Sequence, residues 1–382
     1  MLEWLCLVPV IGGSVYGILC VLAVIAFRAR EVPSDQTFLP PISILKPVYG
    51  LEKNLGENLR SACELDYPNY EVILSAQRLD EPALPIMRRL ADEFGDKRVR
   101  VAVAASQPKM NGKVQNLEIG LAASRHDVLV ISDSDVYLRP DYLHTIVAPL
   151  ADPNVGYVCT LYRAVGAIAW YEHLELLSLN VDFTANLIFA TVTGAADFCL
   201  GASTALHRRT LSAIGGLEPL SVYLAEDYEM GRRIRALGQK AVILPYFVDT
   251  MVDLKSVRQW WDHQVYWDQN TRSANPIGFF ATVLTRALPF AILYAALRMF
   301  DPLGLAVLAA AVAVRLATAA FVLRIGLDDH AGLRSLWLLP LRDVLGLAAW
   351  FAAHVRQNFV WRGHQFGLVK EGRIDPAGER GS

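Results

Sequence analysis

The sequence contains few charged residues and no excess of either sign. Lys, Arg, Asp and Glu make up 19% of the 382 residues, and hydrophobic residues make up 53%, whereas a typical soluble chain is about 25% charged. This composition excludes a disordered chain and a small disulfide scaffold. The 36 basic and 38 acidic residues leave a net charge of −2. The overall charge therefore gives no indication of a nucleic-acid partner, and we expect none.

Cysteine motifs and sequence repeats are also missing. The cysteines form no CxxC pair and are odd in number, which excludes a disulfide framework and a zinc knuckle. Reduced thiols facing the cytoplasm are the simplest interpretation. The five cysteines are Cys6, Cys20, Cys63, Cys159 and Cys199. We also find no internal repeat and no low-complexity linker, so the apolar runs are the main guide to domain organisation.

The first apolar run predicts a membrane anchor over residues 1–30. Leu5–Phe27 holds 23 residues without a charge, which is long enough for a tilted membrane helix. Arg28 and Arg30 follow the run and Glu3 precedes it, so the charges are not those of a cleaved signal peptide. The positive-inside rule places the N-terminus outside and the following chain in the cytoplasm. The alternative is a buried core helix.

Residues 31–275 predict a cytoplasmic α/β domain with a mostly parallel sheet. Apolar runs of strand length alternate there with polar helical stretches, which is typical of such a sheet. The predicted strands include Ile42–Leu45, Val72–Ser75, Val99–Val103, Val128–Ser132 and Tyr157–Leu161.

Residues 276–356 are again apolar, but charges interrupt them. The interrupted segments are Ile277–Leu297 with Arg286 and Pro289, Leu303–Leu323 with Arg315, and Leu336–Val355 with Arg342 and Asp343. A charge inside a membrane segment is costly, so these are spanning helices with functional polar groups or helices partly in the interface.

The predicted tail, residues 357–382, is basic and is expected in the cytoplasm. Four full spans would place it outside. One of the C-terminal segments is therefore expected to be interfacial or re-entrant, and Ile277–Leu297 is the candidate. The basic residues near the C-terminus are Arg356, Arg362, Lys370, Arg373 and Arg380.

Two aspartates at the end of a predicted strand indicate a metal site. Asp133 and Asp135 follow the apolar run Val128–Ser132, where the chain turns and both carboxylates can face one cation. Oxygen ligands suit Mg²⁺ or Mn²⁺, which commonly bridge to substrate phosphates. The alternative is an Asp-rich turn that begins the next helix.

A second acidic motif, Ala225-Glu226-Asp227-Tyr228, precedes a predicted amphipathic helix. Acidic residues in the first turn of a helix often serve only to interact favourably with the helix dipole. The functional interpretation is a general base, Asp227, held at the helix start beside a substrate.

The aromatic segment Gln259–Trp267 forms a third signal. In a helix, Trp260, His263, Gln264 and Trp267 share one face. Such a helix can seat its tryptophans at the membrane interface. It can equally provide polar groups for a diphosphate and an indole for an acceptor, and the two interpretations are compatible.

In order along Pro41–Trp267, these motifs resemble the ceramide glucosyltransferases (glycosyltransferase family 21, bacterial type), which are related to the inverting enzymes of family 2. The ordered residues that carry the resemblance are Lys46-Pro47, Glu64-Leu-Asp66-Tyr67-Pro68, Asp80-Glu81-Pro82, Lys113-Val-Gln-Asn116, Ser132-Asp133-Ser-Asp135, Val192-Thr193-Gly194, Gly201-Ala-Ser203 and Ala225-Glu226-Asp227-Tyr228. Their number and order make the resemblance more specific than any single motif.

The resemblance implies a GT-A fold, a nucleotide-sugar donor, a divalent metal and a membrane-lipid hydroxyl as acceptor. It places Asp80 near the uridine, Asp133 and Asp135 at the metal and diphosphate, and Asp227 as the catalytic base. The family's last motif usually ends in Arg-Trp. Here Trp267 matches, but Tyr266 replaces the arginine, and His263 or Arg272 can compensate.

The resemblance also suggests roles for further residues. Lys46 and Lys113 can contact the donor, although each could be an ordinary solvated lysine. Trp260, Trp261 and Tyr266 are expected at headgroup depth, near the acceptor. Arg286 is predicted to face the acceptor or a phosphate headgroup, and the alternative is a snorkelling arginine at a helix end.

These residues predict an inverting transfer at the bilayer surface. A metal neutralises the leaving diphosphate, and a carboxylate base deprotonates the lipid hydroxyl. One base without a nucleophile suits a single in-line displacement. We expect an integral membrane enzyme (of the inner membrane in a bacterium) that uses UDP-glucose and ceramide. The alternatives are a hopanoid, diacylglycerol or polyprenyl phosphate acceptor with another UDP-sugar, or an inactive membrane scaffold.

Overall fold

The structure is a computed structural model that describes residues 2–32, 37–104, 111–196 and 198–356. Closer to the C-terminus it describes a small antiparallel sheet of β9 (Asn358–Trp361), β10 (His364–Leu368) and β11 (Ile374–Pro376), together with Arg373. The basic residues Arg362, Lys370 and Arg380 of the predicted tail 357–382 lie outside the described residues.

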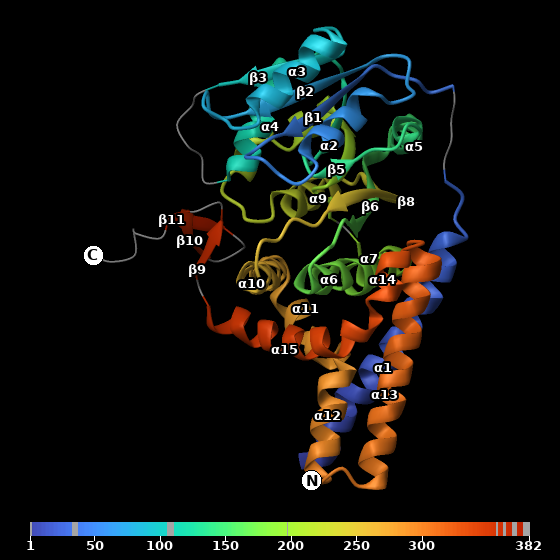
Figure 1. The fold of residues 1–382 in the computed structure, drawn as a ribbon. Helices are drawn as coiled ribbons and strands as arrows, with labels where there is room; N and C mark the ends of the chain where they lie inside the picture. Colours follow the sequence, from blue (N-terminus) through green and yellow to red (C-terminus); the bar gives the residue numbers. More distant parts are fainter. Residues whose placement is uncertain are drawn as a thin grey trace.

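An eight-stranded mixed sheet forms the upper part of the molecule (Figure 1). Its order is β3-β2-β1-β4-β7-β6-β8-β5, with β7 antiparallel to both neighbours and β5 antiparallel to β8. All five predicted strand runs lie in these strands. The strands are β1 (Ile42–Pro47), β2 (Tyr70–Ala76), β3 (Val99–Val103), β4 (Val128–Ser132), β5 (Val136–Tyr137), β6 (Val155–Val165), β7 (Ser203–His207) and β8 (Lys240–Met251).

Helices cover both faces of the sheet, which explains why its central strands are apolar on both sides. One core contains residues of α2 (Leu55–Cys63), α3 (Leu84–Phe94) and α5 (Tyr142–Val147). The opposite core contains residues of α4 (Gly112–Ala123) and α9 (Glu226–Ala236). The short elements η1 (Ala148–Ala151), α8 (Arg208–Ala213) and η3 (Glu218–Leu220) complete this domain.

A layer of helices lies below the sheet. It includes α6 (Trp170–Leu177), η2 (Ser178–Phe183) and α7 (Thr184–Thr193), which follow one another without a break, and α10 (Val257–Ala274). Figure 1 shows α15 (Leu339–Val355) crossing beneath α10. Shorter segments link these helices to the rest: α11 (Pro276–Ala281), η4 (Thr282–Thr285), η5 (Val322–Gly326), α14 (His330–Arg334) and η6 (Leu336–Leu338).

Three helices form a stalk that projects from this layer (Figure 1). They are α1 (Leu2–Arg28), α12 (Ala287–Leu297) and α13 (Pro302–Phe321), and each contacts the other two. Large apolar side chains are exposed along α1, among them Leu5, Ile11 and Ile18. The upper end of α1 is part of the protein core, since Val24 and Phe27 are fully buried there. The stalk and the sheet domain are therefore packed into one unit.

Four helices among the described residues are long and apolar enough to cross a membrane, or five if the bent pair of segments before and after Arg286 counts as one. Ile277–Leu297, the segment expected to be interfacial or re-entrant, lies within this bent pair. Half of Ile277–Leu297, namely α12, runs along α1 and α13, whereas α15 crosses the stalk axis (Figure 1). Pro289 permits this because it lies in the first turn of α12, where a missing N–H breaks no helical hydrogen bond.

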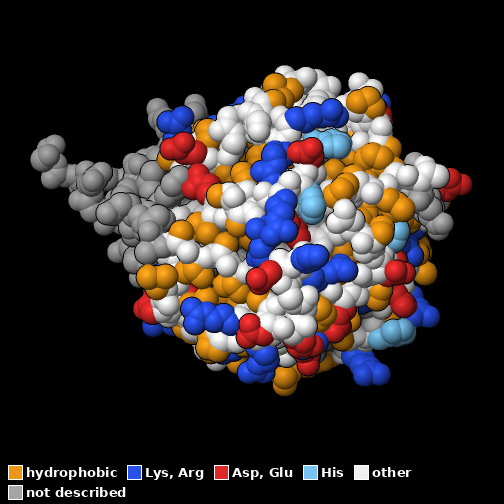
Figure 2. All heavy atoms as spheres, turned by 90° about the horizontal axis from the view of Figure 1, so that it is seen from above, with side chains coloured by type: hydrophobic (Ala, Val, Ile, Leu, Met, Phe, Trp, Pro, Cys, Tyr) orange, Lys and Arg blue, Asp and Glu red, His pale blue; other side chains and the backbone are white. Residues whose placement is uncertain are grey.

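Figure 2 views the end of the molecule opposite the stalk and shows basic and acidic side chains interspersed with hydrophobic ones. The charged side chains of this face contrast with the large apolar side chains exposed along α1.

Candidate functional site

One cavity of about 1070 Å³ joins the edge of the sheet to the stalk. Its lining includes Asp133 and Asp135 after β4 and Asp227 of α9. The same cavity is lined by residues of the stalk, including Gly17 of α1 and Thr318 of α13. The acidic residues of the two predicted motifs and residues of the apolar helices therefore line the same continuous cavity.

Asp133 and Asp135, the predicted metal ligands, lie on a turn that is held in place by the side chain of Lys46. The Lys46 side chain is fully buried and donates from Nζ to the backbone oxygens of Asp133 (2.8 Å) and Val136 (2.9 Å). Burial lowers the pKa of Lys46 to about 8, although the charges of Asp135 and Asp133 oppose the shift. Asp135 Oδ2 accepts a hydrogen bond from Thr250 Oγ1 at 3.0 Å. Lys46 thus shapes the turn and does not itself line the cavity.

Lys113 links the two acidic motifs. Its Nζ lies 2.7 Å from Asp133 Oδ1 and 3.3 Å from Glu226 Oε1. Burial alone would lower the pKa of Lys113, but the carboxylates of Asp133 and Glu226 raise it above its usual value. Asn111 caps α4, because its Oδ1 accepts from the backbone N–H groups of Lys113 and Val114. The lysine is therefore presented by the first turn of a capped helix.

Asp227 is held in the first turn of α9 by two backbone N–H groups. Its Oδ2 accepts from Gly201 at 2.7 Å and its Oδ1 from Tyr228 at 2.8 Å. Burial and the neighbouring charge of Glu226 raise the pKa of Asp227 to about 6. A Cβ at Gly201 would lie 2.9 Å from Asp227 Oδ2 and 2.8 Å from Lys113 Nζ, so any other residue here would displace one of these groups. A carboxylate with a pKa near neutrality is suited to general-base catalysis.

The residues after β4 fit a divalent cation. Burial and the charge of Asp133 raise the pKa of Asp135, and a cation between the two carboxylates would relieve that repulsion. Among the described residues, no group of three or more His, Cys, Asp or Glu side chains could hold a metal. The protein would therefore supply two carboxylates, and substrate phosphates and water would complete the coordination, as is usual for Mg²⁺.

The aromatic segment forms one helix, α10. The residues predicted to share one face of this helix do not all face the cavity. His263, Gln264, Tyr266 and Trp267 line the cavity. Trp260 instead lies in an apolar core beside α6 and α15, where it is 2% exposed, and the partly buried Trp261 packs against that core. Trp260 therefore packs the helical layer together and does not face the cavity.

Glu175 organises the polar side of α10. This carboxylate is 3% exposed, and it accepts from Gln264 Nε2 at 2.6 Å and lies 3.0 Å from His263 Nδ1. Trp267 Nε1 donates to His263 Nε2 at 3.0 Å. Because an indole N–H can only donate, this contact requires Nε2 to accept, which the neutral ring with its proton on Nδ1 allows. Burial alone would lower the pKa of His263, but the charge of Glu175 and its hydrogen bond raise it. The sequence analysis did not identify Glu175, although an acid in the apolar run of α6 was a signal.

The remaining predicted residues lie in different places. Asp80 is outside the cavity lining, with a side chain that is 75% exposed and paired with Arg78 at 2.7 Å. Arg286 lines the cavity at its stalk end. The sequence analysis also did not single out Glu52, which lines the cavity and accepts from Ser134 Oγ at 2.6 Å. Nothing in its local sequence distinguishes Glu52 from a surface acid.

The sequence profile of Glycosyl transferase family 21 matches residues 5–374. The chain belongs to this family. The predicted family is thus confirmed.

Relatives with assigned names match part of the chain. Ceramide glucosyltransferase 1 of Caenorhabditis elegans is 25% identical over 215 residues, which is 56% of this chain and 46% of the nematode protein. The probable glycosyltransferase YdaM of Bacillus subtilis is 23% identical over 250 residues, 62% of this chain and 57% of that protein. The matched region thus spans about half the length of these relatives.

A solved structure shares the architecture. The mannosyltransferase PcManGT from Pyrobaculum calidifontis, in complex with GDP-Man and Mn²⁺, superposes with a TM-score of 0.57 at 20% identity. The superposition covers 93% of this chain and 98% of that chain. The sheet domain of the family 21 protein therefore has the GT-A fold that the sequence predicted.

We expect Glu175→Gln to change the tautomer of His263. A glutamine cannot accept from both His263 and Gln264 while its own amide N–H faces one of them. In ¹⁵N spectra of histidine-labelled protein, the Nδ1-protonated signal of His263, assigned with His263→Asn, should shift towards a mixture of tautomers. Glu172→Gln is the matched control, because Glu172 is a buried acid of the same helix that accepts from the backbone N–H groups of Ile168 and Ala169. An unchanged His263 signal in Glu175→Gln would contradict the assignment.

Proposed function

We propose that this protein is a membrane-bound inverting glycosyltransferase that moves a hexose from a UDP-sugar to a lipid hydroxyl. The proposed substrates are UDP-glucose and ceramide. One observation carries the proposal: the Asp133–Asp135 turn and Asp227 line a cavity that continues between the apolar stalk helices. Membership of family 21 and the names of the nematode relatives support the choice of substrates.

In the proposed reaction, the lipid oxygen bonds to the anomeric carbon of the sugar, and the bond from that carbon to the diphosphate breaks. The proton of the lipid hydroxyl passes to Asp227, whose carboxylate is fixed by Gly201 and Tyr228. A single displacement inverts the anomeric centre. Asp133 and Asp135 would hold Mg²⁺ or Mn²⁺, which supplies neutralising charge to the leaving diphosphate.

Other residues of the cavity would bind the two substrates. Lys113, His263 and Trp267 would contact the donor, and Lys46 would act on it through the turn that it supports. Asp80 follows the end of β2 and would reach the uridine only if its pairing with Arg78 is released. The acceptor would approach Asp227 from the stalk side, past Tyr266, with Trp260 and Trp261 holding α10 at the membrane surface.

We also propose an orientation in the membrane. Three spans, α1, the α11–α12 pair and α13, would carry the chain from an external N-terminus to an internal C-terminus. Arg28 and Arg30 at the upper end of α1 and the basic residues of 357–382 support this sidedness. The catalytic domain would then face the cytoplasm, with α15 along the interface.

The direct test is transfer by purified protein. Labelled UDP-sugars, Mg²⁺ or Mn²⁺, and a panel of ceramide, diacylglycerol, hopanoid and polyprenyl phosphate should yield a labelled lipid from UDP-glucose and ceramide. Asp227→Asn should lower kcat by roughly 10²- to 10⁴-fold, since it removes the base, while UDP-sugar affinity stays within about twofold because binding does not require the base. No product from any pair with folded protein would refute the enzyme, and near-normal turnover of Asp227→Asn would refute the base.

The pH dependence of transfer should report the pKa of Asp227. A general base acts only when it is deprotonated, so kcat/KM should rise with pH up to about 6 and then level off. Since the charge of Glu226 contributes to the raised pKa, Glu226→Gln should shift this rise to lower pH. A rise that stays at the same pH in Glu226→Gln would show that another group controls the rate.

A further inference from the structure

The bent pair of segments in the stalk is broken at Arg286. The segments Pro276–Thr285 and Ala287–Leu297 meet there at a bend of 50°. Arg286 itself has non-helical backbone angles, φ −91° and ψ 67°, and α12 starts at the next residue without a side-chain cap. The first N–H groups of a helix have no partner within the helix. The N-terminus of α12 therefore lies within an apolar segment, next to Arg286.

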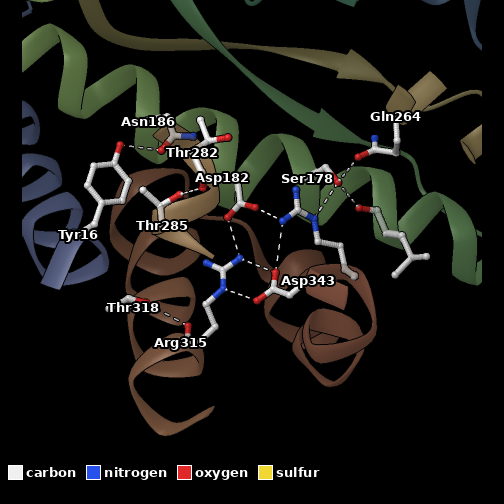
Figure 3. A network of polar contacts seen from close by, with 12 residues as sticks. Tyr16, Ser178, Asp182, Asn186, Gln264, Thr282, Thr285, Arg315, Thr318 and Asp343 are labelled. Atoms are coloured by element: carbon white, nitrogen blue, oxygen red, sulfur yellow. Dashed lines mark hydrogen bonds and ion pairs between the residues drawn. The ribbon is translucent and has the colours of Figure 1, made fainter. Parts of the chain in front are cut away.

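The other charges near the stalk satisfy one another. Arg315 donates to Asp343 at 2.8 Å and to Asp182 at 2.7 Å. Arg342 bonds the same two aspartates and also donates to Ser178 Oγ at 3.0 Å. Figure 3 shows this group, with the aspartates between the two guanidinium groups. The charges of these two arginines and two aspartates therefore balance, and each arginine bonds both aspartates.

Arg286 is not part of that set. Its side chain makes no hydrogen bond or ion pair with any residue in the described part of the chain, and its Nε is buried. Asp268 lines the same cavity and its charge attracts Arg286, but no hydrogen bond or ion pair joins the two side chains among the described residues. Arg286 as a whole is only partly buried, but a buried donor N–H without a hydrogen-bond partner is costly, so its Nε is expected to meet a ligand.

Two glycines make room for this arrangement. A Cβ at Gly346 of α15 would lie 2.9 Å from Arg286 Nη1. A Cβ at Gly13 of α1 would lie 2.6 Å from the backbone oxygen of Thr285 and 2.8 Å from the nitrogen of Ala287. Glycine inside a helix is less stable than alanine. The chain nevertheless has glycine at these two helices, which surround one guanidinium and one helix N-terminus.

An unpaired guanidinium beside a helix N-terminus is suited to an oxyanion. Arginine binds phosphate through two parallel hydrogen bonds, and the N–H groups and dipole of a helix start favour negative charge. Broken membrane helices present such half-helix N-termini to anionic groups. Gly13, Arg286 and Ala287 all line the cavity, and the apolar stalk helices lie on either side. The ligand therefore needs a phosphate at one end and aliphatic chains at the other.

We propose that Arg286 and the N-terminus of α12 bind the phosphate of a lipid headgroup, at a site separate from the Asp133–Asp135 turn. The bound lipid is distinct from a ceramide acceptor, which carries no phosphate. Its phosphate lies beside Arg286 and the start of α12 and supplies the hydrogen-bond acceptor that Arg286 lacks within the described residues. This binding does not depend on sugar transfer, so it can be tested whether or not the proposed function is correct.

The test measures lipid binding to the purified full-length protein in a neutral detergent. Dioleoyl phosphatidic acid and dioleoylglycerol form a matched pair that differs only in the phosphate, and native mass spectrometry gives the occupancy of each. Wild-type protein should bind the phosphatidic acid at least tenfold more tightly than the diacylglycerol. Arg286→Gln should abolish this preference. Arg324→Gln should retain it, because Arg324 is exposed, pairs with Asp328 and does not line the cavity.

Two further variants cover the case in which Arg286→Gln does not fold. Arg286→Lys keeps the charge but not the paired donors, and Gly346→Ala keeps the arginine but displaces its Nη1. Both should retain part of the preference, with binding weaker than in the wild type. An equal preference in wild type and in these variants would overturn the proposal. Inorganic phosphate that displaces the phosphatidic acid at equal concentration would show a site for a free anion and overturn its assignment to a lipid.

Discussion

The position of Lys113 between carboxylates is the interaction on which the transfer site depends. Asp133, Glu226 and Asp227 come from two motifs about a hundred residues apart, and like charges this close disfavour one another's ionised forms. The ammonium of Lys113 contacts two of them directly and lies next to Gly201, which holds the third. The cap by Asn111 and the absence of a Cβ at Gly201 both serve this contact. Without Lys113, the carboxylates of the two motifs would repel one another.

The same arrangement places the proposed catalytic residues beside the apolar helices. The upper end of α1 is buried in a core of the sheet domain, and α10 is fixed through Glu175 to the helix that follows β6. The cavity can therefore pass from Asp227 to the stalk without crossing a mobile linker. In the proposed reaction the lipid stays among the apolar helices and presents only its hydroxyl to the base.

Much of the fold and part of the site could be predicted from local sequence. The strands are continuous apolar runs, and the two acidic motifs follow elements that the pattern identifies. Asp80 was predicted from its order among the motifs, and in the structure its exposed side chain pairs with Arg78. Trp260 shares a helical face with His263, but packing against α6 and α15 buries it. Glu175 and Gly346 gain their roles only from contacts across the fold, which periodicity does not reveal.

The proposed reaction requires donor, base and acceptor to meet in one cavity. A structure of the protein in lipid nanodiscs with UDP, Mn²⁺ and ceramide would test this directly. We expect the diphosphate beside Asp133 and Asp135, and the ceramide between α1 and α13 with its primary hydroxyl within hydrogen-bond distance of Asp227. A ceramide bound elsewhere, or a nucleotide away from the Asp133–Asp135 turn, would contradict it.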